Sequence, residues 1–109
     1  MITEQQIQEV QRIVVTEVNP ERVYLFGSLA RGQHHKDSDM DLLVVVSEEL
    51  NDELRIQVMM NLRKSTYIPK LMFPKDFLVY SKKEFEELKS DKYSFLFHVL
   101  KDARPLYAA

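Results

Sequence analysis

Two short apolar segments, separated by a polar connector, constrain the fold of this chain more than any other feature. Residues Arg22–Phe26 are β-branched and aromatic and precede a glycine, and residues Met40–Val46 are apolar at nearly every position. Both patterns are typical of buried strands. The connector, residues 28–38, has eleven residues, slightly fewer than the dozen or more that a parallel crossover takes. We therefore expect an antiparallel pair of strands.

Helix signals flank this pair of strands. Thr3 and Gln6 match a capping box, which predicts that a helix starts there and continues to Asn19. After the second strand, apolar residues at every fourth position predict a helix from Ser47 to about Thr66. These apolar residues are Leu50, Leu54, Val58 and Leu62.

The last third of the chain is predicted to add one strand and two helices. Residues Asp76–Tyr80 form a third apolar strand segment. Residues 81–84, Ser-Lys-Lys-Glu, match a second capping box and predict a short helix to about Leu88. A final helix is expected to start near Asp91 and to end before Pro105.

An apolar connector, Ile68–Phe73, lies between the second helix and the third strand. We expect it to cover the core, and a partner surface is the less favoured alternative. The chain shows no repeat and no domain linker, so we expect a single domain over residues 1–109. The order of elements predicts an α+β fold, in which a small mixed β-sheet with its first two strands antiparallel is flanked by helices.

The composition excludes several classes of protein. Fifteen basic and seventeen acidic residues give a net charge of −2, so no basic field indicates nucleic-acid binding. The chain has no cysteine, which excludes disulfides and thiolate metal sites. Its N-terminus is polar, and no apolar run approaches the roughly 18 residues of a membrane span. We expect a soluble cytoplasmic protein.

Acidic residues gather at the start of the second strand. Because side chains alternate along a strand, Asp39 and Asp41 face the same side. Two like charges this close disfavour each other's ionisation unless a cation is present. Carboxylate oxygens without histidine or thiolate neighbours suit a hard cation, above all Mg²⁺ bound to substrate phosphates. Asp76 opens the third strand and is the candidate for a third carboxylate.

The first strand ends at Gly27 and Ser28, which antiparallel pairing brings beside these aspartates. Glycine permits a close backbone approach to phosphate, and successive N–H groups of a tight turn attract anions. The Ser28 hydroxyl adds a donor. Arg31, one turn later, is either a surface residue or a bidentate phosphate contact. The loop and the carboxylates together could bind a nucleoside triphosphate and its metal ion. Phosphoryl-type transfer needs phosphates and metal positioned in this way.

The two halves of this site, in this order and spacing, resemble a known family. The string Phe-Gly-Ser-Leu-Ala-Arg-Gly at residues 26–32, followed by Asp-Ser-Asp-Met-Asp at residues 37–41, is similar to the signature of the DNA-polymerase-β-like nucleotidyltransferase superfamily. It most resembles the minimal nucleotidyltransferase (MNT) branch, whose members are about this size. The similarity covers most of the chain, including Asp76 and the helix start that follows it.

This resemblance implies a polymerase-β-like palm fold and a role for each matching residue. Gly27 and Ser28 would hold the nucleotide phosphates. Asp39 and Asp41 would bind two Mg²⁺ ions, and Asp76 would complete one metal site and act as base. The family relation further implies transfer of AMP from ATP to a hydroxyl, with a tyrosine of a HEPN ribonuclease toxin as acceptor, so that the chain is an antitoxin. The HEPN motif does not occur in this sequence, and the toxin is therefore expected to be a separate chain.

Other functions stay open at the level of the sequence. One is a non-catalytic antitoxin that neutralises its toxin by binding. A transferase that acts on a small molecule or on RNA ends is less favoured, because 109 residues leave no room for an acceptor-binding domain. The sequence does not specify the acceptor, the nucleotide preference or the oligomeric state; a homodimer and a hetero-oligomer with the toxin are both compatible with it.

Four further polar residues have less specific interpretations. Asp37 precedes the regular strand and is interpreted as capping or ordering the turn. His34 and His35 lie in a polar loop and are expected to be solvated. His98 lies in an apolar helix, where a core or interface histidine with satisfied hydrogen bonds is favoured over a ligand.

Overall fold

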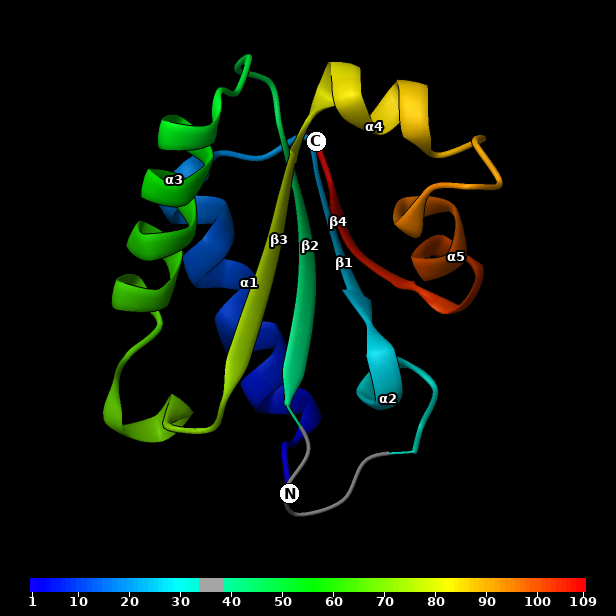
Figure 1. Cartoon of the computed structure of the whole chain (residues 1–109). Helices are drawn as coiled ribbons and strands as arrows, with labels where there is room; N and C mark the ends of the chain where they lie inside the picture. The colour runs from blue at the N-terminus through cyan, green and yellow to red at the C-terminus, as the bar shows by residue number, and fades with distance from the viewer. Residues whose placement is uncertain (34–38) are drawn as a thin grey trace.

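A computed structural model describes residues 1–33 and 39–109. Its centre is a four-stranded sheet in the order β3-β2-β1-β4, with helices on both faces (Figure 1). Strand β1 (Arg22–Phe26) pairs antiparallel with β2 (Met40–Val46) and with β4 (Arg104–Ala108), whereas β2 runs parallel to β3 (Lys75–Ser81). The expected α+β fold with a mixed sheet and an antiparallel first pair is therefore confirmed.

The first helix, α1 (Glu4–Val18), forms as the sequence predicts. The Thr3 hydroxyl accepts from the Gln6 N–H, and the Gln6 side chain accepts from the Thr3 N–H, so the capping box is closed. The helix ends at Asn19, whose φ of 46° is left-handed and stops further helical bonds. Its buried residues, Ile7, Val10 and Val14, belong to the core under the sheet.

The second predicted helix starts later than expected. Helix α3 spans Asp52–Ser65, and the expected start at Ser47 is wrong. The Asn51 side chain accepts from the Leu54 N–H at 2.7 Å, and this cap starts the helix at Asp52, five residues after Ser47. Leu50 consequently precedes the helix, and Leu54 is exposed although it fits the four-residue spacing.

In the C-terminal region, one helix forms as predicted, the next starts later than predicted, and one strand is additional. Helix α4 (Lys82–Leu88) follows the predicted capping box, but α5 (Phe95–Asp102) starts four residues after Asp91, at a cap provided by Ser94. Strand β4 was not predicted at all, because Pro105 reads as a helix stop and a poor strand residue. An edge strand tolerates proline, and β4 has one free edge and an irregular register beside Val23 and Tyr24.

The two faces of the sheet are covered to different extents. Helices α1 and α3 cover one face, where the larger apolar core lies (Figure 1). The sheet residues of that core are Val23, Leu25, Met40, Leu42, Val44, Val46, Phe77 and Val79. Helices α4 and α5 cover the other face around Leu43, Val45, Phe85 and Leu96. In Figure 1 they occupy the top and the right of this face, so that the starts of β2 and β3 are not crossed by them.

The apolar connector before β3 mostly serves the core, as expected. Its 3₁₀ turn, Pro69–Leu71, buries Leu71, while Ile68 and Phe73 pack against the core. Met72 is exposed. Within the described ranges, no helix is both long and apolar enough to span a bilayer.

Candidate active site

Antiparallel pairing of β1 and β2 brings the glycine of the loop against the second aspartate. Phe26 is the partner of Asp41, and Gly27, with φ of +76°, begins the short helix α2 (Gly27–Ala30) directly after it. A Cβ atom added to Gly27 would lie 2.4 Å from Asp41 Oδ2. Two properties of position 27 therefore require glycine: its backbone is left-handed, and the Asp41 carboxylate fills the space that a side chain would occupy.

Parallel pairing of β2 and β3 brings the third aspartate to the same place. Asp41 and Asp76 are direct partners in the register, and such partners point to the same face of a sheet. Asp39 lies two residues before Asp41 and precedes the first residue of β2. The three predicted carboxylates thus gather at the start of β2 and β3, on the face that α4 and α5 leave partly open.

The electrostatics of Asp41 show this convergence. Burial raises the pKa of Asp41 above its ordinary value of 3.8, and the negative charges of Asp76 and Asp39 raise this pKa further. The positive charge of Arg31 opposes the shift. Asp41 is therefore a half-buried carboxyl with more negative than positive neighbours. A bound cation would offset the repulsion among these carboxylates.

Asp76 also meets a cation from another element. Arg63, in the last turn of α3, places Nη2 at 3.5 Å from Asp76 Oδ1. The two side chains are 59% and 60% exposed, so water screens this ion pair. Sequence reasoning missed Arg63, because a basic residue at the end of a helix is already explained by the helix dipole.

The donor atoms fit magnesium by type, but they do not form a closed ligand set. Among residues 1–33 and 39–109, no group of three or more acidic, histidine or cysteine side chains is arranged to hold a metal ion. The set nonetheless offers only hard carboxylate oxygens, and it carries uncompensated charge at Asp41. These two properties suit Mg²⁺ and exclude a soft-metal site.

The loop side of the site comes from α2. The first N–H groups of a helix have no hydrogen-bond acceptor within the helix. The N–H groups of Gly27 and Ser28 can therefore donate to an anion. Arg31 caps this turn, is exposed, and donates from Nε to Gln33 at 3.3 Å. Backbone donors, one hydroxyl and one guanidinium therefore surround the point where β1 ends.

Two hollows flank the carboxylates. One, of about 380 Å³, includes Asp76 and Arg63 and is bounded by Tyr67 and Met72; we call it the Asp76 pocket. The other, of about 290 Å³, includes Gly27 and is bounded by α5; we call it the α5 pocket. Its lining residues are Phe26, Gly27, Arg31, Phe95, His98, Val99 and Asp102. A larger hollow of about 520 Å³ lies along α1 and contains none of the predicted site residues.

The remaining histidine and aspartate predictions have different outcomes. His34, His35 and Asp37 lie outside the described residues. His98 is exposed rather than part of the core; its Nε2 lies 3.0 Å from the Lys92 carbonyl oxygen, and its ring packs edge-on against Phe97.

Comparison with known proteins identifies the family of this arrangement. The model of the family described as "Polymerase beta, Nucleotidyltransferase" matches residues 8–109. The chain belongs to this family. The resemblance seen in the Gly-Ser and Asp-x-Asp motifs is thereby confirmed, and the protein is a nucleotidyltransferase. Comparison with the sequences of curated proteins gives no match.

Several solved structures share the fold of this chain. A toxin–antitoxin complex with AMP-PNP is 21% identical with a TM-score of 0.59, covering 99% of this chain and 75% of that one. Spectinomycin adenyltransferase from Enterococcus faecialis, with ATP and spectinomycin, is 21% identical with a TM-score of 0.64, covering 98% and 56%. The complex of a tri-AMPylated Shewanella oneidensis HEPN toxin with its MNT antitoxin is 19% identical with a TM-score of 0.51, covering 97% and 70%.

Proposed function

We propose that this nucleotidyltransferase moves AMP from ATP to a hydroxyl of a HEPN-type ribonuclease toxin, most specifically to a tyrosine, and thereby acts as an antitoxin in the cytoplasm. The observation that carries the proposal is the convergence of Asp39 and Asp76 on half-buried Asp41, against which Gly27 packs. Structural neighbours that hold AMP-PNP or an AMPylated HEPN toxin support the choice of donor and partner.

Each residue has a defined task in this reaction. Ser28 and the N–H groups of α2 bind the β- and γ-phosphates, and Arg31 adds charge to them. Asp39 and Asp41 would hold two Mg²⁺ ions, and Asp76 would be a further ligand. Bound Mg²⁺ would neutralise negative charge on the phosphate oxygens. Arg63 contacts only Oδ1 of Asp76, at 3.5 Å, and this contact is exposed to solvent.

The chemical step is a displacement at the α-phosphorus. Asp76 accepts the proton of the acceptor hydroxyl, whose oxygen forms a bond to the α-phosphorus. The bond from this phosphorus to the bridging oxygen of the β-phosphate breaks, and pyrophosphate leaves with the electron pair. The Asp76 side chain is 60% exposed, so a hydroxyl of a protein acceptor can reach it from solvent.

The test is transfer of label from α-³²P-ATP to a co-purified partner in the presence of Mg²⁺. We expect Asp41→Asn to reduce the rate at least about 100-fold, because the loss of several kcal/mol of charge stabilisation corresponds to two or more factors of ten. Asp52→Asn, which removes an exposed acid in the first turn of α3, is the matched control and should keep the rate. Equal labelling by wild type and Asp41→Asn would refute the proposed function.

A second candidate is neutralisation by binding alone. It is favoured by the lack of a closed three-carboxylate cluster within the described ranges. In cells that express the toxin, an Asp39→Ala protein that still restores growth would support occlusion. Loss of protection in a variant that still binds the toxin would support catalysis.

A further inference from the structure

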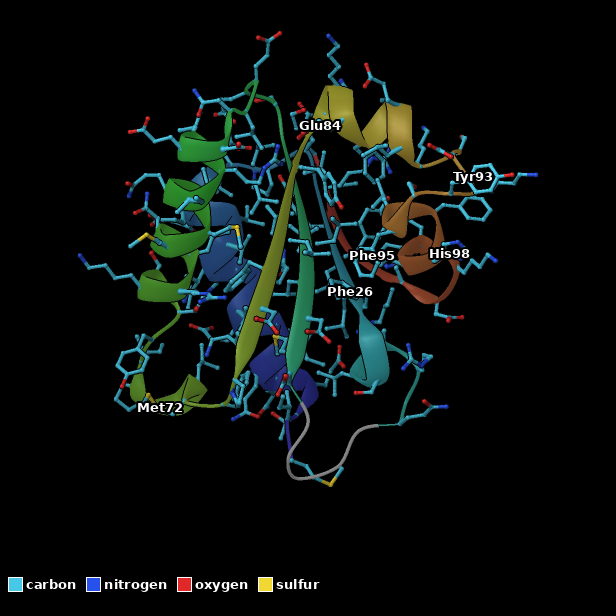
Figure 2. The ribbon with its side chains drawn as sticks, viewed as in Figure 1. Phe26, Met72, Glu84, Tyr93, Phe95 and His98 are labelled. Carbon is cyan, nitrogen blue, oxygen red and sulfur yellow. The ribbon has the colours of Figure 1, made fainter. Side chains whose placement is uncertain are left out.

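The α5 pocket opens directly beside the loop that is proposed to bind phosphate. Gly27, the first residue of α2, and Arg31, which caps α2, both line it. Figure 2 shows Phe26, at the end of β1, and Phe95 and His98, on α5, gathered on this side of the sheet, while Tyr93 points away from it. A ligand whose phosphates lie on α2 therefore has this hollow within reach.

Aromatic and acidic groups define the chemistry of the α5 pocket. Phe95 is 61% exposed at the start of α5, although a ring of this size gains free energy from burial. Flat aromatic rings stack on nucleic-acid bases, and a carboxylate such as Asp102 accepts hydrogen bonds from hydroxyl or amino groups. His98 is held through Nε2 by the Lys92 carbonyl, which fixes its ring at the rim.

The direction of the proposed reaction assigns the two hollows to different ligands. The attacking hydroxyl must reach Asp76, and Asp76 lines the other hollow. In an in-line displacement, pyrophosphate leaves on the side opposite to the acceptor, toward Ser28 and Arg31. The nucleoside part then extends sideways from the α-phosphate, and the hollow next to Gly27 on that side is the α5 pocket.

The volume agrees with a small ligand. At about 290 Å³, the α5 pocket lies just below the roughly 300–1,000 Å³ typical of small-molecule sites in proteins. We propose that the α5 pocket binds the base and ribose of the nucleotide donor, with the Phe95 ring stacked on the base. This inference rests on the proposed function and adds to it the site of the nucleoside.

Calorimetry on the intact chain with two ligands tests the inference. The first ligand is α,β-methylene-ATP, which cannot transfer AMP, and the second is inorganic tripolyphosphate, both with Mg²⁺. Phe95→Ala should weaken binding of the nucleotide analogue roughly 10- to 100-fold, the typical effect of removing one stacked ring. Tripolyphosphate, which lacks a base, should bind this variant as it binds wild type.

Matched variants separate stacking from loss of structure. Tyr93→Ala removes a ring that is 86% exposed, two residues before Phe95 and outside the pocket, and should leave the affinity for both ligands unchanged. Phe95→Trp keeps a stacking ring and should restore the affinity for the nucleotide analogue. Tyr67→Ala removes an aromatic ring from the Asp76 pocket and should also leave nucleotide binding unchanged.

Each contrary result has its own meaning. Unchanged nucleotide affinity in Phe95→Ala overturns the inference and leaves the proposed function standing. A loss confined to Tyr67→Ala overturns it as well and assigns the base to the Asp76 pocket. If neither ligand binds wild type, the proposed function and the inference both fall.

Discussion

Substitutions at Gly27 and Gly32 can distinguish the effect of backbone strain from the effect of a contact with the site. Both have left-handed φ, +76° and +71°, but an added Cβ meets Asp41 Oδ2 only at Gly27 and open space at Gly32. An alanine at either position costs about 1–2 kcal/mol because a side chain disfavours this backbone region. Only at Gly27 must the Asp41 carboxylate also move.

We therefore predict that Gly27→Ala and Gly32→Ala lower the free energy of unfolding by similar amounts, about 1–2 kcal/mol. Urea denaturation measures this effect. The two variants should differ in function, because Gly27→Ala displaces Asp41: tripolyphosphate with Mg²⁺ should bind Gly32→Ala and not Gly27→Ala. Equal binding by both variants would contradict the role assigned to the contact.

Asp41 gives a second prediction at this scale, on pH. Because the pKa of Asp41 is raised in the folded protein, the folded state binds more protons than the unfolded state between the ordinary and the raised pKa. Ionised Asp41 thus lowers stability above that window in the absence of metal. Asp41→Asn should stabilise the metal-free protein at pH 7 by less than about 1 kcal/mol, since the group is partly solvated.

The measurement is the free energy of unfolding of wild type and Asp41→Asn across pH. The gain from the substitution should shrink as the pH falls through the raised pKa and then below 3.8, since only below 3.8 is wild-type Asp41 protonated in both states. A gain that stays constant with pH would show that charge at Asp41 is not its cause.

At the scale of residues, the sequence indicates part of the site. The sequence predicts that Asp39 and Asp41 lie together because strand alternation is local, and it makes Asp76 a candidate because Asp76 opens a strand. Arg63, Phe95 and Asp102 were not found, since their proximity to the site depends on how α3 and α5 pack. No local pattern distinguishes these residues from ordinary helix residues.

At the scale of elements, one ion pair connects three of them. Arg55 of α3 donates to both carboxylate oxygens of Glu84 at 2.6 and 3.0 Å, and also to the Val79 carbonyl of β3 at 2.6 Å. Glu84 in turn closes the capping box of α4 with Ser81. Hydrogen bonding from Arg55 lowers the pKa of Glu84 below its ordinary value of 4.5.

Glu84→Gln should separate the ion pair from the cap, because glutamine can still close a capping box. We expect a loss of about 1 kcal/mol at pH 7, as for a partly exposed charged pair. Stability from the lowered pKa is present above 4.5 and is lost as the pH falls through that lowered pKa. Thermal denaturation should therefore show the two proteins converging in acid; a difference that persists there would exclude the ion pair as its source.

Local signals predicted most elements, and the misses have physical causes. Capping boxes identified α1 and α4 because side chain and backbone interact within four residues. The start of α3 was misplaced because Leu50 continues the apolar spacing without being helical. Strand β4 was missed because its identity comes from pairing with β1, at the far end of the described chain.

At the scale of the whole molecule, ligand binding should appear as stability. A ligand that binds only the folded state at 100 times its Kd adds about 2.7 kcal/mol. We predict that α,β-methylene-ATP with Mg²⁺ raises the Tm of wild type and that Asp39→Ala removes most of this increase. Scanning calorimetry with and without Mg²⁺ measures it; an increase that survives without Mg²⁺ and in Asp39→Ala would show nucleotide binding that is independent of the carboxylates.

The position of β1 in the sheet also affects how the chain is synthesised. Arg22 pairs with Val45 on one side and with Ala108 on the other. At roughly 5–20 residues per second, a ribosome needs several seconds to produce the sequence between these two partners. A β1–β2 hairpin formed during this interval would have one edge of β1 open, and open strand edges can pair with other chains. The strand that leads into the proposed phosphate loop thus keeps an unpaired edge for longer than β2, whose second partner, β3, is synthesised earlier than β4.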